Sequence, residues 1–155
     1  MATVTERMSK VDTAWLRMER PTNLMMIVGV WVLKPGVSRE ALCQRIEERL
    51  LQYPQFRQRV EQDAAGATWV HDEHFAMDRH VVLEKLARKS KGREQEALQD
   101  RVAELAVQPL DRLRPLWQFH LVENYKGGSA MMVRIHHCIA DGIALISVTM
   151  SIVDG

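Results

Sequence analysis

The sequence predicts an α+β domain in which helices flank a mixed, largely antiparallel sheet. Apolar residues recur at helical spacing in several segments, they alternate with polar residues in others, and a glycine turn joins the last two alternating segments. A chain of 155 residues with 46% hydrophobic composition is long enough and apolar enough to bury one core. We therefore expect one layered body of sheet and helices over residues 1–155.

Helical periodicity favours helices at residues 9–20, 38–52 and 94–107. Ser38 has the side chain of an N-cap, and Pro21 and Pro109 lie where the first and third segments stop. Residues 142–153 are also apolar and roughly helical. These segments supply the helices that would cover a sheet.

The strands are predicted from alternation and from β-branched residues. The apolar run at residues 24–33 contains valines, isoleucine and Trp31 and precedes a Lys-Pro-Gly turn, which favours a buried strand over a helix. Shorter strands are predicted at residues 56–60, 68–70 and 80–83. Residues 116–122 and 130–136 alternate clearly, and the turn at residues 126–129 joins them into an antiparallel hairpin.

Charge and cysteine usage exclude several classes of protein. Lysine and arginine total 21 against 20 for aspartate and glutamate, so the net charge of +1 provides no field that would attract nucleic acid. Cys43 and Cys138 lie far apart, which indicates neither a disulfide framework nor a zinc ribbon and fits a reducing cytoplasm. Residues 1–16 lack the apolar core of a secretory signal, and residues 24–33 are too few for the ~20-residue span of a membrane helix.

Residues 136–142, with the sequence HHCIADG, carry the candidate chemistry at the end of a predicted strand. If His136 and His137 both stay extended, their side chains point to opposite faces, so only one of them is expected to act as a base. Asp141 lies near a helix N-terminus, where a carboxylate can cap N–H groups or pair with an arginine, and Gly142 permits close backbone approach. From these residues alone, surface or satisfied core histidines are the favoured interpretation.

The spacing of this stretch changes that interpretation, because HHxxxDG resembles the active-site signature of the CoA-dependent acyltransferase superfamily. The superfamily includes chloramphenicol acetyltransferase, peptide-synthetase condensation domains, plant acyltransferases and bacterial wax ester synthase/diacylglycerol acyltransferases. The resemblance implies that His137 deprotonates the acceptor, with His136 beside it in the motif, and that Asp141 and Gly142 maintain the geometry of the site. It also implies a fold like the N-terminal subdomain of chloramphenicol acetyltransferase, and no bound cofactor or metal.

A second motif narrows the resemblance to one branch. Pro115, Leu116 and Trp117 resemble the PLW motif of wax ester synthase/diacylglycerol acyltransferases, and residues 11–19 are similar to the N-terminal segment of those enzymes. Trp117 by itself is more often a core residue, but the combination makes the three residues candidates for lining a substrate channel.

The branch implies transfer of a fatty acyl group from acyl-CoA, as co-substrate, to a long-chain alcohol or diacylglycerol. Members have two subdomains, so we expect residues 1–155 to be the first, to need the C-terminal subdomain on the same or a separate chain, and to be inactive alone. The lipid substrates imply a location peripheral to a membrane or lipid inclusions. Two alternatives stay open: a condensation-type or small-molecule acyltransferase of the same superfamily, and a non-catalytic half-domain that binds a partner chain.

Three weaker signals have simpler explanations. His71 and His74 lack the helical spacing of a zinc protease motif, so an exposed polar loop is expected there. Cys138 follows His137 directly, and adjacent residues rarely aim at each other, which argues against a thiol nucleophile. The basic cluster at residues 88–93 is expected to be a solvated loop rather than a contact for acidic lipid or a CoA phosphate.

Overall fold

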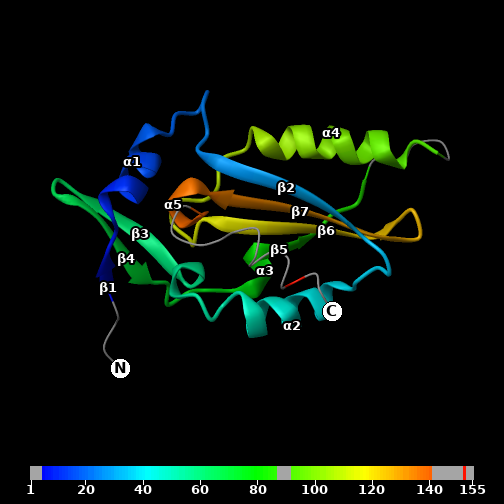
Figure 1. The fold of residues 1–155 in the computed structure, drawn as a ribbon, viewed down its shortest axis with the longest axis horizontal. Coiled ribbons are helices and arrows are strands. Elements are labelled where there is room, and N and C mark those ends of the chain that lie inside the picture. The colour runs from blue at the N-terminus through cyan, green and yellow to red at the C-terminus, as the bar shows by residue number, and fades with distance from the viewer. Residues whose placement is uncertain (1–4, 87–91, 141–151, 153–155) are drawn as a thin grey trace.

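The computed structural model of the chain describes residues 5–86, 92–140 and 152 (Figure 1). Its elements follow in the order β1 (Thr5–Arg7), α1 (Lys10–Met18), β2 (Met26–Leu33), α2 (Arg39–Arg49), the 3-10 turn η1 (Pro54–Phe56), β3 (Gln58–Asp63), β4 (Gly66–His71), α3 (Met77–His80), β5 (Val81–Leu83), α4 (Glu94–Ala106), β6 (Trp117–Tyr125), β7 (Gly128–His136) and α5 (His137–Ala140). None of the helices formed by these residues has the length and apolar character needed to cross a membrane.

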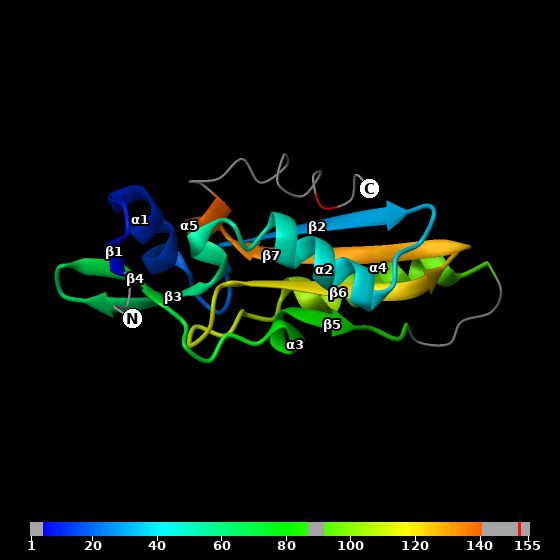
Figure 2. The same cartoon turned by 90° about the horizontal axis from the view of Figure 1, so that it is seen from below.

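A four-stranded sheet in the order β2-β7-β6-β5 forms the centre of the fold. The β6–β7 hairpin and the β2–β7 pair are antiparallel, whereas β5 runs parallel to β6. Helix α4 covers one face of this sheet and α2 the other (Figures 1 and 2). The predicted fold class, a mixed and largely antiparallel sheet flanked by helices, is confirmed.

Alternation along β7 divides the interior into two cores. Met131, Val133 and Ile135 belong to the core that includes the apolar stripe of α2, whereas Ala130 and Met132 pack with apolar residues of α4. Ser38 caps α2 by accepting a hydrogen bond from the Ala41 backbone N–H, as the sequence predicts. The structure therefore confirms the antiparallel hairpin and the three helices predicted at residues 9–20, 38–52 and 94–107. Each of these helices is shorter than its predicted range. The helix predicted at 142–153 falls outside the described residues, apart from Ile152.

A second, three-stranded sheet in the order β1-β4-β3 was only partly predicted. Strand β3 begins two residues later than predicted, because residues 56–57 belong to η1 and its end. It continues to Asp63, and β4 is longer than the predicted strand at both ends. Strand β1 was not predicted, and it pairs with β4 through Thr5↔Val70 to Arg7↔Thr68. Helix α3 was not predicted, and its last residue, His80, is the first residue of the strand predicted at residues 80–83.

The hairpin between β6 and β7 depends on two glycines. Lys126 and Gly127 both adopt positive φ angles, of 47° and 80°, which is the requirement of a tight two-residue turn between antiparallel strands. Gly128 then passes so close to β2 that a Cβ atom on it would lie 2.1 Å from the Leu33 carbonyl oxygen. The turn and the β2–β7 pairing therefore leave no room for a side chain at position 128.

A buried network of charged groups joins the sheet to α4. Arg134 on β7 is 4% exposed and donates to the Gln108 carbonyl at 2.8 Å, to Nε2 of His120 at 3.1 Å and to the Gln118 side chain. Because Nε2 of His120 accepts, its Nδ1 carries the proton and donates to Glu84, 2.8 Å away. Burial lowers the pKa of His120, so this ring is held neutral between the two charges. Arg134, near the end of β7, thus ties the loop that follows α4 to the sheet.

Candidate active site

The two histidines of the HHxxxDG stretch lie on different secondary-structure elements. His136 is the last residue of β7 and His137 the first of α5, so the condition that both residues stay extended is not met, and strand alternation does not set the directions of the two side chains. The His137 backbone N–H still donates to the Met25 carbonyl, as the next step of the β2–β7 pairing would, but the Met25 N–H donates to the Glu19 carboxylate, so the pairing goes no further. Both side chains contact the region of α1, His136 at Glu19 and His137 at Trp15.

His136 is a buried, neutral side chain. It is 1% exposed, and its Nδ1 accepts a hydrogen bond of 3.0 Å from the Cys138 backbone N–H. Its Nε2 lies 3.2 Å from a Glu19 oxygen, but the alignment is too poor for a hydrogen bond, so this contact is electrostatic. Burial lowers the pKa of His136 to about 4, assisted by the positive charge of Arg112 and opposed by Glu19. His136 therefore holds the start of α5 and has little access to a substrate.

Glu19 connects four parts of the site. One carboxylate oxygen accepts from the Met25 backbone N–H at 3.1 Å and lies beside His136, and the other accepts from Arg112 at 2.9 Å. Arg112 also donates to the Leu16 carbonyl at 3.0 Å. The carboxylate is 10% exposed. It ties the end of α1 to the start of β2, to the loop before β6 and to the histidine pair.

His137 is the partly exposed member of the pair. Its imidazole stacks on the indole of Trp15, with ring centroids 4.5 Å apart and planes inclined by 19°. Cys138, the next residue, is 1% exposed, and burial raises the pKa of its thiol to about 12. A thiol that stays protonated is a poor nucleophile, in agreement with the prediction from sequence.

The three residues of the PLW motif lie in the interior of the chain. Pro115, Leu116 and Trp117 are buried, and the Trp117 indole donates to the Phe56 carbonyl at 2.9 Å within the core. Leu116 supports the histidine pair through its carbonyl, while Pro115 and Trp117 line a cavity of about 370 Å³. A role for these three residues in a substrate channel stays a prediction.

Asp141, Gly142 and most of the basic cluster at residues 88–93 lie outside the described residues. His71 and His74 are exposed, as expected of a polar loop.

Trp15, Glu19 and Arg112 were not singled out as functional residues. Trp15 and Glu19 fall within the segment at residues 11–19, which is similar to the N-terminal segment of the family. The usable signal was their spacing: residues 15 and 19 are four apart, so on a helix they share one face. No sequence pattern indicated a role for Arg112, because residues in a loop do not follow the periodicity of a helix or strand.

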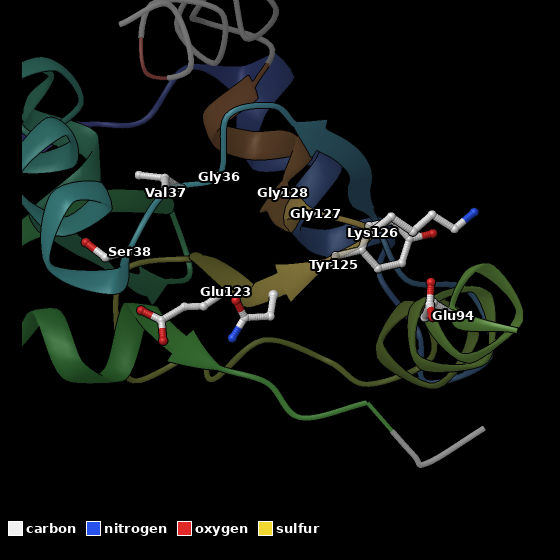
Figure 3. Close-up of a pocket in the computed structure, with 10 residues that line it drawn as sticks. Gly36, Val37, Ser38, Glu94, Glu123, Tyr125, Lys126, Gly127 and Gly128 are labelled. Atoms are coloured by element: carbon white, nitrogen blue, oxygen red, sulfur yellow. The ribbon is translucent and has the colours of Figure 1, made fainter. Parts of the chain in front are cut away.

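A cavity of about 720 Å³ lies at the opposite end of β7 from the histidines (Figure 3). It is lined by the hairpin turn, by the start of α2 and by Glu94 and Glu123. The nine residues of β7 span about 26 Å at ~3.3 Å per residue, so this hollow is remote from His137. Its lining contains Glu94 and Glu123 against Lys126, and this excess of negative charge disfavours the phosphates of a nucleotide or coenzyme.

Sequence and structure comparisons decide the family. A sequence model described as the wax ester synthase/diacylglycerol acyltransferase catalytic domain matches residues 8–155. The chain belongs to this family. It is 33% identical over 156 residues to tgs3, a probable diacylglycerol O-acyltransferase of Mycobacterium tuberculosis, covering 96% of this chain and 56% of the relative. It is 27% identical to wax ester synthase/diacylglycerol acyltransferase 1 of Arabidopsis thaliana, covering 81% of this chain and 27% of that protein.

Solved structures confirm the fold. The wax ester synthase/diacylglycerol acyltransferase of Marinobacter aquaeolei VT8 superimposes with a TM-score of 0.67 at 21% identity, covering 92% of this chain and 37% of that one. The starter condensation domain of rhizomide synthetase RzmA gives a TM-score of 0.73 at 16% identity, over 96% of this chain and 38% of the domain. The chain therefore spans about half the length of tgs3 and about a third of the solved structures.

Proposed function

We propose that these residues form the N-terminal subdomain of an O-acyltransferase that moves a fatty acyl group from acyl-CoA to a long-chain alcohol or diacylglycerol. The observation that carries the proposal is the difference between the two histidines. His136 is buried and held neutral, whereas His137, one residue later, is partly exposed on the first turn of a helix. His137 is therefore the general base, and the products are wax ester or triacylglycerol together with free CoA.

The reaction proceeds by direct attack. Neutral His137 accepts the proton of the acceptor hydroxyl as its oxygen bonds to the thioester carbonyl carbon, which gives a tetrahedral oxyanion. Collapse of this species breaks the carbon–sulfur bond, and the departing CoA thiolate receives the proton from His137. General base action supplies ~10²–10⁴-fold, so orientation of the substrates and stabilisation of the oxyanion supply more of the rate enhancement.

Several findings on relatives support this substrate class. Two of the similar proteins carry diacylglycerol acyltransferase or wax ester synthase in their names. One structure of the RzmA condensation domain is a complex with C8-CoA, which makes a CoA thioester a reasonable co-substrate for the shared fold. The C-terminal subdomain, on the same or a separate chain, would complete the channel. A cytoplasmic protein peripheral to a membrane or lipid inclusion would meet both substrates.

The test uses the complete two-subdomain protein with palmitoyl-CoA and either hexadecanol or diacylglycerol. Release of CoA thiol and extraction of the lipid product measure turnover. His137→Ala should lower kcat by at least ~10²-fold with the fold retained, because it removes the proton acceptor and, of the packing, chiefly the contact with Trp15. His74→Ala, a substitution at an exposed histidine, is the matched control.

Near-normal turnover in His137→Ala would contradict the assigned base. Acylation of amines or small alcohols without ester formation from hexadecanol would favour the condensation-type or small-molecule alternative. Absence of any turnover in the complete wild-type protein would favour the non-catalytic alternative.

A further inference from the structure

We infer that Trp15 is a positioning residue, which holds the His137 ring by stacking in the orientation that proton transfer requires. The inference rests on the proposed function, because it takes His137 as the general base. Trp15 lies on α1, more than a hundred residues before the motif in the sequence, and neither motif includes it.

The stack is close and nearly parallel. The two ring centroids are 4.5 Å apart and the planes are inclined by 19°, which is the geometry of an offset aromatic stack. The His137 backbone is fixed by its hydrogen bond to the Met25 carbonyl at 2.8 Å. The remaining freedom of the side chain is rotation about its two χ angles, and a flat indole against one ring face restricts both of them.

Trp15 is able to act as a fixed support because both ends of α1 are anchored. Ser9 caps the beginning of the helix by accepting from the Asp12 backbone N–H at 3.1 Å. Leu16, the neighbour of Trp15, is 1% exposed, and its carbonyl accepts from Arg112. Glu19, directly after the helix, is held by Arg112 and by the Met25 N–H, the same residue whose carbonyl holds His137.

The indole N–H of Trp15 indicates whether the tryptophan acts by stacking or by hydrogen bonding. Nε1 of Trp15 is buried and has no hydrogen-bond partner among the residues that the structure describes. A buried donor without a partner lowers stability, so phenylalanine could keep the stack and remove that penalty. Trp15→Phe is therefore the conservative variant, and Trp15→Leu removes the aromatic ring while keeping an apolar side chain.

The experiment compares Trp15→Leu, Trp15→Phe and His137→Ala with wild type in the complete protein. Trp15→Leu should lower kcat about tenfold and change KM less than about twofold, because the base spends less time in the productive rotamer. Trp15→Phe should restore kcat to within about threefold of wild type without lowering the melting temperature. A residue that only packed would lower the melting temperature and leave the kcat of the folded protein unchanged.

A second readout does not depend on turnover. Diethyl pyrocarbonate modifies accessible imidazoles, and peptide mass spectrometry gives the modification rate of His137 relative to the exposed His74. Trp15→Leu should raise that ratio at least about threefold because it uncovers one ring face, and Trp15→Phe should leave it near the wild-type value. If Trp15→Leu does not fold, Trp15→Met replaces it, since methionine adapts to irregular space.

The outcomes are distinguishable. Normal kcat in Trp15→Leu, with His137→Ala inactive, overturns the positioning role and leaves the proposed function intact. A loss in Trp15→Phe equal to that in Trp15→Leu also overturns it, because the stack would then not be what matters. Normal turnover in His137→Ala refutes the proposed function instead, whatever the modification rates show.

Discussion

Acidification should destabilise the chain through His136, and the size of the effect follows from its burial. In the folded chain the pKa of His136 is lowered to about 4, because its ring is 1% exposed. In the unfolded chain a histidine titrates near ~6.5. The unfolded state therefore takes up a proton below about pH 6.5, while the folded state does so only near pH 4.

These two pKa values set both the sign and the magnitude of the change in stability. A pKa lowered by folding gives stability that is fully present above the unfolded pKa and is lost as the pH falls through the folded pKa. For the pKa of about 4 in His136, the loss is about 2 kcal/mol at pH 5 and about 3 kcal/mol at pH 4. A loss of 2 kcal/mol is a large fraction of the stability of a small domain.

Urea unfolding at pH 7.5 and pH 5 measures this loss when wild type is compared with His136→Asn. The Oδ1 atom of asparagine can replace Nδ1 of His136 as the acceptor for the Cys138 N–H, so the variant loses the titrating group but keeps the bond. Burial also lowers the pKa values of His80 and His120, but both contribute equally to wild type and variant and cancel in the difference. His74→Asn, at an exposed position, is the control.

We expect His136→Asn to lose about 2 kcal/mol less than wild type between these two pH values. An equal loss in both proteins would refute the argument, because His136 would then not be the group that resists protonation. A smaller loss in wild type than in the variant would show that the Glu19 contact at 3.2 Å outweighs burial and favours the imidazolium.

Two further predictions concern stability. Gly128→Ala should destabilise the chain by more than ~2 kcal/mol in urea unfolding, because its Cβ would lie 2.1 Å from the Leu33 carbonyl oxygen. The control is Gly29→Ala, whose Cβ would lie 3.6 Å from its nearest atom, and it should change stability by less than ~1 kcal/mol. Arg134→Met should lower stability by about 3 kcal/mol, because it leaves buried acceptors without their donor, whereas Arg59→Met, which removes an ion pair near the surface, should cost less than ~1 kcal/mol. Similar losses within either pair would contradict the structural reasoning.

Local patterns account for the parts of the fold that the sequence could predict. Helix α2 has a capping serine and an apolar stripe at i, i+4 and i+8, and the β6–β7 hairpin has clear alternation on both sides of a glycine turn. In both cases the information lies within a dozen or so neighbouring residues. The same is true of the histidine motif, whose spacing identified its family.

The elements that were missed depend on contacts between distant segments. Strand β1 consists of three exposed residues, and it becomes a strand because β4, about sixty residues later, offers an edge to pair with. The contacts of Arg134 with Gln108, just after α4, and of Trp15 with His137 likewise join distant positions. Single-sequence periodicity contains no information about such partners.

The division of labour between the two histidines follows from where the strand stops. His136 precedes the first residue of α5, and its Nδ1 accepts from the N–H of the second, so it acts as the N-cap of that helix. A cap fixes the residue at which a helix begins, and here that residue is His137. Burial supports this role, because a ring kept neutral at physiological pH retains the lone pair with which Nδ1 accepts the hydrogen bond. His136 therefore determines the backbone position of His137, while Trp15 determines the plane of its ring.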